Sequence, residues 1–312
     1  MTLTDIPRAP LVGLGLPGAA ARVRRTALTA LAPAIWGSTY VVTSELLPPD
    51  RPLFAALARA LPAGLIALAI SRTLPRGEWW WRSLVLGTLN IGAFFPLLFV
   101  GAQRLPGGVA ATFGAVQPLL VALLVVALLR EALSRWRLGW GIVGVLGVAL
   151  VVLGPDAALD PVGIGAALAA ATSMSLGVTL TKRWGRPVGA GPVALAGWQV
   201  TAGGAVLLVP TLVVEGVPMH VDGAALAGYA WLALVGGLVA YTVWFAGIAS
   251  LPVTATSLLG LLTPLVAAVL GVVVLGQVLA PVQLVGFALA LAALLAGQLA
   301  PQARRARAAA RA

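Results

Sequence analysis

The 312 residues are 60% hydrophobic and 9% charged, with a mean hydropathy of +1.02 and a formal net charge of +11. A soluble domain carries about 25% charged residues, so this composition excludes an ordinary water-soluble domain and predicts a protein dissolved in a lipid bilayer. The chain has no cysteine, which excludes disulfides and metal sites built on sulfur. Its basic residues lie in short clusters between apolar runs, a pattern typical of membrane topology rather than nucleic-acid binding.

A helix that crosses the ~30 Å hydrocarbon core needs about 20 mostly apolar residues. Ten segments meet this requirement: 27–47, 52–71, 82–102, 106–129, 136–154, 160–181, 190–213, 224–249, 252–275 and 279–300. We expect an N-terminal segment, 1–26, before them and a basic tail, 301–312, after them, both in the cytoplasm. The sequence thus predicts an all-α membrane protein with ten transmembrane helices.

Basic residues gather on alternate connections between these segments. If the N-terminus is cytoplasmic, 17 basic residues fall on the cytoplasmic side and two, Arg51 and Arg104, on the other. The 17 are Arg8, Arg22, Arg24, Arg25, Arg72, Arg76, Arg82, Arg130, Arg135, Arg137, Lys182, Arg183, Arg186, Arg304, Arg305, Arg307 and Arg311. Cytoplasmic loops are enriched in Lys and Arg, so this split predicts a multi-pass protein of the bacterial inner membrane with both termini in the cytoplasm.

The fourth and ninth segments resemble each other at a constant offset of 146 residues, LPGGVAATFGAVQPLLVALLVVALLREAL at 105–133 and LPVTATSLLGLLTPLVAAVLGVVVLGQVL at 251–279. A duplication at this spacing indicates two five-helix repeats, 27–154 and 160–300. Five is odd, so the repeats must enter the membrane in opposite senses, as inverted-topology repeats do. The second repeat has lost the basic residues that follow the fourth segment: Gly276, Pro281 and Gln283 stand where the first has Arg130, Arg135 and Arg137.

Two prolines, Pro118 and Pro264, lie at matched positions about 12 residues into the repeated helices. At ~1.5 Å per residue, both come near the bilayer midplane. A proline frees the carbonyl four residues earlier, which belongs to Gly114 in one repeat and to Gly260 in the other. The kinks either expose backbone and polar groups to a central cavity and act in gating, or serve helix packing alone.

Polar and aromatic side chains at mid-membrane depth are the candidates for a substrate pathway. Trp36 and Tyr40 are four residues apart and share a helix face. Asn and Gln are costly in lipid unless they face partners or water, so the deep ones should line the bundle interior. The expected pathway residues are Trp36, Tyr40, Arg59, Asn90, Gln117, Trp198, Gln199, Tyr241 and Thr263. The Ser/Thr-rich stretches 38–44 and 172–181 are expected to join helices by default.

Arg59 is the single charge expected within a membrane segment. Its side chain could extend toward the outer headgroups or pair with Glu45 at the end of the first helix. Alternatively, it faces the cavity as a fixed positive charge for a substrate carboxylate, which suits the planar guanidinium.

Enzymatic constellations are absent from the sequence. His220 is the only histidine and falls in a predicted outside loop, no aspartate pair lies within the membrane segments, and no nucleotide-binding GxxxxGK[ST] motif occurs. We therefore expect no catalytic residues, no cofactor and no metal.

Four stretches together resemble the EamA family of the drug/metabolite transporter superfamily: WGSTYVV (36–42), FAALARALPAG (54–64), QPLLVALLVVALLREALSRWR (117–137) and TPLVAAVLGVVVLGQVL (263–279). The resemblance covers roughly 27–300 and implies movement of small metabolites by alternating access. Of the glutamates that end the fourth and ninth helices in this pattern, Glu131 is kept and Gln277 replaces the second.

The leading hypothesis is a secondary transporter that exports an amino-acid-like or drug-like metabolite from a site at the repeat interface. Uptake of a sugar or nucleotide-sugar-like solute is the alternative, followed by a channel or a lipid-translocating module. The expected partners are a small-molecule substrate and the lipid bilayer, not nucleic acid, and the sequence leaves a homodimer open.

Overall fold

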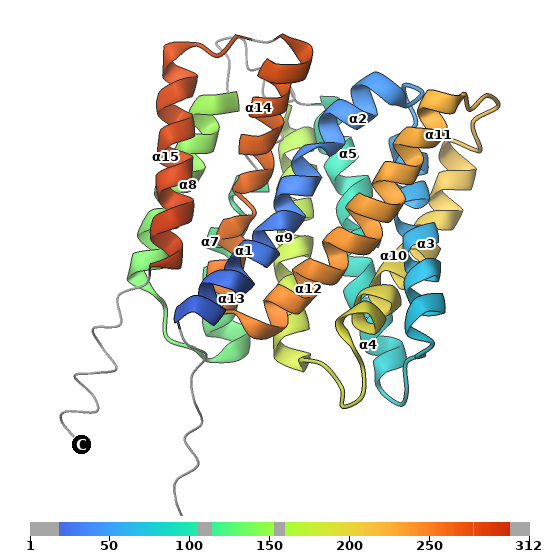
Figure 1. The fold of residues 1–312 in the computed structure, drawn as a ribbon, viewed down its shortest axis with the longest axis horizontal. Coiled ribbons are helices and arrows are strands. Elements are labelled where there is room, and N and C mark those ends of the chain that lie inside the picture. Colours follow the sequence, from blue (N-terminus) through green and yellow to red (C-terminus); the bar gives the residue numbers. More distant parts are fainter. Residues whose placement is uncertain (1–18, 105–113, 153–159, 277, 300–312) are drawn as a thin grey trace, which may run out of the picture.

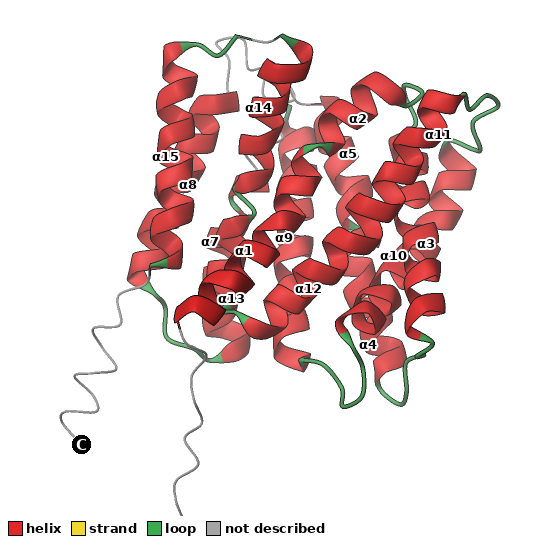
Figure 2. Ribbon diagram, viewed as in Figure 1, coloured by secondary structure: helices red, strands yellow, loops and turns green. Residues whose placement is uncertain are grey.

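The computed structural model describes residues 19–104, 114–152, 160–276 and 278–299, and every regular element in these ranges is a helix (Figure 2). The first half contains α1 (Ala19–Gly37), α2 (Thr39–Leu46), α3 (Pro52–Ser71), α4 (Trp79–Gly87), η1 (Thr88–Gly92), α5 (Phe94–Arg104), α7 (Gln117–Leu124), η2 (Val125–Leu129) and α8 (Arg135–Val152). The second contains α9 (Pro161–Trp184), α10 (Pro192–Val214), α11 (Gly223–Ala230), η3 (Trp231–Val239), α12 (Ala240–Ser250), α13 (Val253–Leu259), α14 (Leu262–Leu275) and α15 (Pro281–Gln298). The η elements are π-helical.

Local sequence explains where several of these helices begin. Helices α3, α9, α10 and α15 each start with a proline, whose fixed φ suits the first helical turn and whose missing N–H is not needed there. Asp160 caps α9 by accepting a hydrogen bond from the Gly163 N–H. Asp222 caps α11 in the same way, by accepting one from the Ala225 N–H.

Membrane-length helices are confirmed, whereas the count of ten remains a prediction. Seven helical stretches in the described ranges are long and apolar enough to cross a bilayer: Pro52–Ser71, Trp79–Leu98, Pro161–Trp184, Pro192–Val214, Gly223–Ser250, Val253–Leu275 and Pro281–Gln298. The apolar helix Gln117–Leu129 is shorter. Helix α1 begins at Ala19, earlier than the predicted 27, so part of the expected N-terminal segment is helical. The predicted tail, 301–312, lies outside the described residues.

The helices run up and down along one common direction (Figure 1). One end of the bundle, drawn at the bottom, carries the start of α1, the α3–α4 and α9–α10 loops and the end of α15. We name it the basic end, because Arg72, Arg76 and Arg186 lie in those loops. The other end, which we name the opposite end, carries loops 47–51 and 215–222.

Packing follows a pattern of matched pairs. Helix α8 packs against α15 on one flank of the bundle and α3 against α10 on the other, while α1 packs against α12 and α5 against α9 between them (Figure 1). Close approach of α8 and α15 requires glycine: a Cβ on Gly147 would lie 2.5 Å from the Ala290 nitrogen, and one on Gly286 would lie 2.5 Å from the Gly147 oxygen.

Helical hydrogen bonding is interrupted directly before both repeated prolines. Helix α14 follows a turn at Gly260–Leu261, and α7 follows a turn at Val116. In each turn an N–H binds the carbonyl three residues back, Leu119 to Val116 at 2.9 Å and Thr263 to Gly260 at 3.1 Å. A further break at Ser38, which the sequence did not indicate, separates α1 from α2.

Candidate functional site

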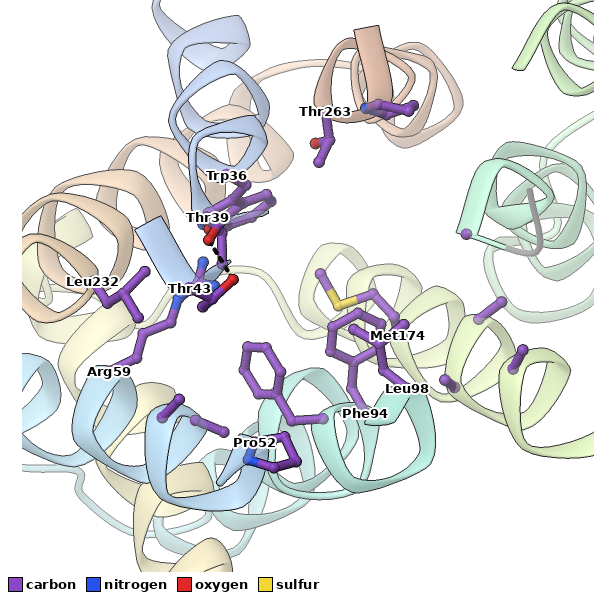
Figure 3. Close-up of a pocket in the computed structure, with 18 of the residues that line it drawn as sticks. Trp36, Thr39, Thr43, Pro52, Arg59, Phe94, Leu98, Met174, Leu232 and Thr263 are labelled. Carbon is purple, nitrogen blue, oxygen red and sulfur yellow. Dashed lines mark hydrogen bonds between the residues drawn. The ribbon is translucent and has the colours of Figure 1, made fainter. Parts of the chain in front are cut away.

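A cavity of about 470 Å³ lies inside the bundle and extends to the opposite end (Figure 3). Side chains from α1, α2, α3, α5, α7, α9, η3, α12 and α14 form its wall. Most of the wall is apolar, and its inner part includes Trp36, Ala56, Phe94, Phe95, Leu98, Ala170, Met174, Leu232, Tyr241 and Trp244. Loop residues Leu47, Pro48, Pro49, Asp50 and Arg51 form the mouth.

Arg59 places a positive charge in this wall. Its residue is 6% exposed, and its Nη2 donates a hydrogen bond of 3.2 Å to the carbonyl oxygen of Gly236. The Trp36 Nε1 donates to the same oxygen at 3.0 Å. Gly236 belongs to the π-helical segment η3, and its neighbour Gly237 lets that segment approach α3, because a Cβ there would lie 2.7 Å from the Arg59 oxygen.

Aromatic rings surround the guanidinium. Its Cζ lies 5.4 Å from the ring centre of Phe95, 5.8 Å from that of Tyr241 and 6.0 Å from that of Trp36. Each cation–π contact of this kind contributes about 0.5–2 kcal/mol, which offsets part of the cost of burying the charge. Glu45, in contrast, is exposed and accepts a hydrogen bond from Ser44. This geometry fits the cavity-facing interpretation of Arg59 rather than an extension toward lipid headgroups.

The two helix breaks that precede Pro118 and Pro264 also reach the cavity. Gly114, Gln117, Gly260, Thr263 and Pro264 line it, whereas Pro118 is buried in its helix and does not. The Thr263 hydroxyl donates to the Pro33 carbonyl at 3.1 Å, which joins the start of α14 to α1. Discontinuous helices are typical of the substrate sites of secondary transporters.

Three of the expected pathway residues lie elsewhere. Asn90 and Gln199 are fully buried and bind each other, with 2.9 Å between the Asn90 Nδ2 and the Gln199 Oε1. Trp198 is near the basic end, where its Nε1 donates to the Thr73 carbonyl at 2.7 Å. None of the three lines the cavity. The side chain of Tyr40 lies outside the described part of the structure.

Several wall residues carried no clear signal in the sequence. Phe94, Leu98 and Met174 are apolar and look like lipid-facing side chains, while Thr39 and Thr43 belong to a stretch expected only to join helices. Thr39 and Thr43 are four residues apart and therefore share one face of α2, which could have indicated a polar part of the cavity wall. Within the described ranges, no three His, Cys, Asp or Glu residues gather where they could hold a metal ion.

Comparisons with known proteins agree with this architecture. The chain matches the EamA-like transporter family over residues 25–153 and again over 161–296. It is 46% identical to Protein PecM of Dickeya dadantii over 264 residues, covering 85% of this chain and 89% of that protein. It is 28% identical to a probable terminal-alkyne amino-acid exporter of Streptantibioticus cattleyicolor over 250 residues, covering 78% of this chain and 80% of that one.

The fold also resembles a solved structure. A crystal structure with 18% sequence identity superposes with a TM-score of 0.76 and covers 89% of this chain and 97% of its own. At that identity the likeness concerns the fold alone. The double family match, extending over most of the sequence, settles the assignment: the chain belongs to the EamA-like transporter family, a family of membrane transporters.

Proposed function

We propose that this protein is a secondary transporter that carries a small, carboxylate-bearing metabolite through the bacterial inner membrane by alternating access. The observation that carries the proposal is the buried Arg59 in the wall of the central cavity. A cavity of about 470 Å³ falls within the ~300–1,000 Å³ range of small-molecule sites. Its apolar wall with one buried cation suits a metabolite or drug-like solute that joins a carboxylate to an apolar body.

The architecture that we propose is ten membrane helices in two inverted five-helix repeats. The helix contacts support this architecture. If each helix is replaced by its counterpart in the other repeat, the contact between α1 and α12 becomes the contact between α9 and α5. The contacts α3–α10 and α8–α15 are each converted into themselves. Such an exchange is what a pseudo-twofold axis in the membrane plane requires. The basic end, rich in Arg and Lys, then faces the cytoplasm together with both termini.

Export is the direction that we favour, and the similarity to a probable amino-acid exporter supports it. Residues Trp36, Arg59, Gln117, Tyr241 and Thr263 are the proposed substrate contacts because they share the cavity wall. The breaks before Pro118 and Pro264 are the proposed hinges. Gly114 and Gly260 supply the backbone freedom there.

Counterflow in proteoliposomes tests the proposal. Vesicles loaded with an unlabelled solute take up the labelled one transiently if a carrier exchanges them, whereas a channel gives flux without trans-stimulation. We expect trans-stimulated exchange of a carboxylate-bearing solute and no exchange in Arg59→Met, with Arg183→Met as the matched control because Arg183 is exposed at the basic end. Exchange of sugars but not of carboxylates, or flux without trans-stimulation, would contradict the proposal.

A further inference from the structure

The charges along the cavity wall are unevenly distributed. Among the lining residues, three carry a charge: Arg59 deep in the wall, and Asp50 and Arg51 at the mouth. Arg59 is 6% exposed, whereas Asp50 is exposed and precedes the first turn of α3. The described inner wall therefore presents a cation and no carboxylate.

Distance separates the two kinds of charge. Helix α3 starts at Pro52, so Arg59 lies about 10 Å further along its axis at ~1.5 Å per residue, and Asp50 lies beyond the helix start. In an α-amino acid the nitrogen and the carboxyl carbon are joined through one Cα, with bonds of about 1.5 Å each. An α-amino acid whose carboxylate binds Arg59 therefore finds no carboxylate at that depth of the described wall for its ammonium group, since Asp50 is exposed at the mouth.

The surroundings of Arg59 are unsuited to a second cation. The ring faces of Phe95, Tyr241 and Trp36 already lie against the guanidinium. An ammonium group held beside it would be repelled by Arg59 and would lose its water without gaining an acid partner. The remaining wall, with Phe94 and Met174, can take up an apolar group.

We propose that this cavity selects organic anions, a carboxylate on an apolar body, over zwitterionic amino acids with the same body. Arg59 binds the carboxylate, and the absence of an acid from the described inner wall excludes the α-ammonium group. This inference rests on the proposed function, since it assigns the substrate class of the same site.

Three probes with one phenyl body test the selectivity: 3-phenylpropionate, L-phenylalanine and 2-phenylethylamine. Binding to the purified protein is followed by tryptophan fluorescence, because Trp36 and Trp244 line the cavity. We expect 3-phenylpropionate to bind at least tenfold more tightly than L-phenylalanine, and 2-phenylethylamine not to bind. In Arg59→Gln the preference for 3-phenylpropionate should disappear, while Arg183→Gln, at an exposed arginine, should keep it.

A second variant covers the case in which Arg59→Gln does not fold. Arg59→Lys keeps the charge but loses the planar donor pair, so it should keep the order of the three probes with weaker binding of 3-phenylpropionate. Equal or tighter binding of L-phenylalanine by the wild-type protein, or no binding of 3-phenylpropionate, would overturn the inference.

Counterflow separates this inference from the proposed function. If L-phenylalanine and 3-phenylpropionate exchange equally well, the selectivity is refuted and the transporter assignment stands. If 3-phenylpropionate binds with the expected preference but neither probe shows trans-stimulated exchange, the anion site stands and the transport proposal falls.

Discussion

The two ends of the bundle are held together differently. At the basic end, Lys182 of α9 donates from its Nζ to the carbonyl oxygens of Ala249 at 3.2 Å and Leu251 at 2.8 Å, where α12 turns into α13. Arg137 of α8 donates to the Thr254 hydroxyl at 3.0 Å and to the Gly297 carbonyl at 3.4 Å. These bonds join α9 to the α12–α13 turn, and α8 to α13 and α15.

At the opposite end the main polar contacts join neighbours on one side. Glu215, at the end of α10, accepts hydrogen bonds of 2.8 Å from the N–H groups of Leu53 and Phe54, and Arg51 donates to its carbonyl oxygen. These contacts cap the start of α3. They do not bridge the mouth of the cavity, which is lined by loop 47–51. The cavity lining reaches loop 47–51, so under the proposed alternating access this conformation is the state open at the opposite end, and we expect the basic end to be closed in it.

The largest effect is expected from breaking the seal with Lys182→Met. Hydrogen bonds from a charged donor contribute about 1.5–3 kcal/mol each, so the equilibrium ratio of the state open at the opposite end to the other state should fall at least ~tenfold. Turnover needs both states, and the initial rate of counterflow should fall accordingly. Arg183→Met, one residue further along α9, is the control. Equal rates in both variants would show that Lys182 does not hold the seal.

The hinge between the ends is tested by Pro264→Ala. Alanine restores the N–H that can bind the Gly260 carbonyl, and one such bond is worth about 1 kcal/mol, enough to favour a straight helix by roughly fivefold. Counterflow should slow by about that factor with unchanged protein yield, and Pro118→Ala should behave similarly. Pro281→Ala, at the first turn of α15, provides a proline control without a kink. Normal counterflow in the Pro118→Ala/Pro264→Ala double variant would assign both prolines to packing.

The opposite end should contribute to stability rather than to turnover. Glu215→Gln weakens the cap of α3, which should cost about 1 kcal/mol and lower the midpoint of thermal unfolding. Counterflow at a permissive temperature should stay near the wild-type rate. Glu45→Gln changes an exposed carboxylate of the same end and should leave the midpoint unchanged. A strong loss of transport in Glu215→Gln with an unchanged midpoint would mean that this end is also a gate.

The smallest effect is expected between the two ends, at the Asn90–Gln199 pair. Interhelical hydrogen bonds within membranes average about 0.6 kcal/mol. Asn90→Leu, Gln199→Leu and the double variant form a cycle whose coupling free energy, measured by unfolding in detergent, should be of that size. The apparent KM for the transported solute should not change. A severalfold rise in KM would place the pair in the substrate pathway after all.

The sequence indicated that Arg59, Asn90 and Gln199 are buried, but not the direction in which each side chain points around its helix. Apolar length and proline placement predicted the helices and the breaks near Pro118 and Pro264, because both are local properties. Asn90 and Arg59 looked alike as deep polar residues, yet one binds Gln199 and the other faces the cavity. Which neighbour a side chain meets depends on how distant helices pack.

Other parts of the site depend on backbone geometry that the sequence does not encode locally. The carbonyl of Gly236, which accepts hydrogen bonds from Trp36 and Arg59, lies in a π-helical segment whose residues look like any apolar helix. Leu98 and Met174 face the cavity, but lipid would suit them equally well. Three-dimensional packing alone distinguishes these cases.

One labelling experiment tests the central claim that the cavity opens alternately to the two sides. The chain has no cysteine, so Leu98→Cys places a single thiol in the cavity wall and Val188→Cys, at a fully exposed position in the α9–α10 loop, marks the basic end. We predict that a membrane-impermeant maleimide added outside cells labels Leu98→Cys and not Val188→Cys. The transported solute should slow that labelling, and Lys182→Met should reduce it. Labelling of Leu98→Cys that ignores both the solute and Lys182→Met would contradict alternating access through this cavity.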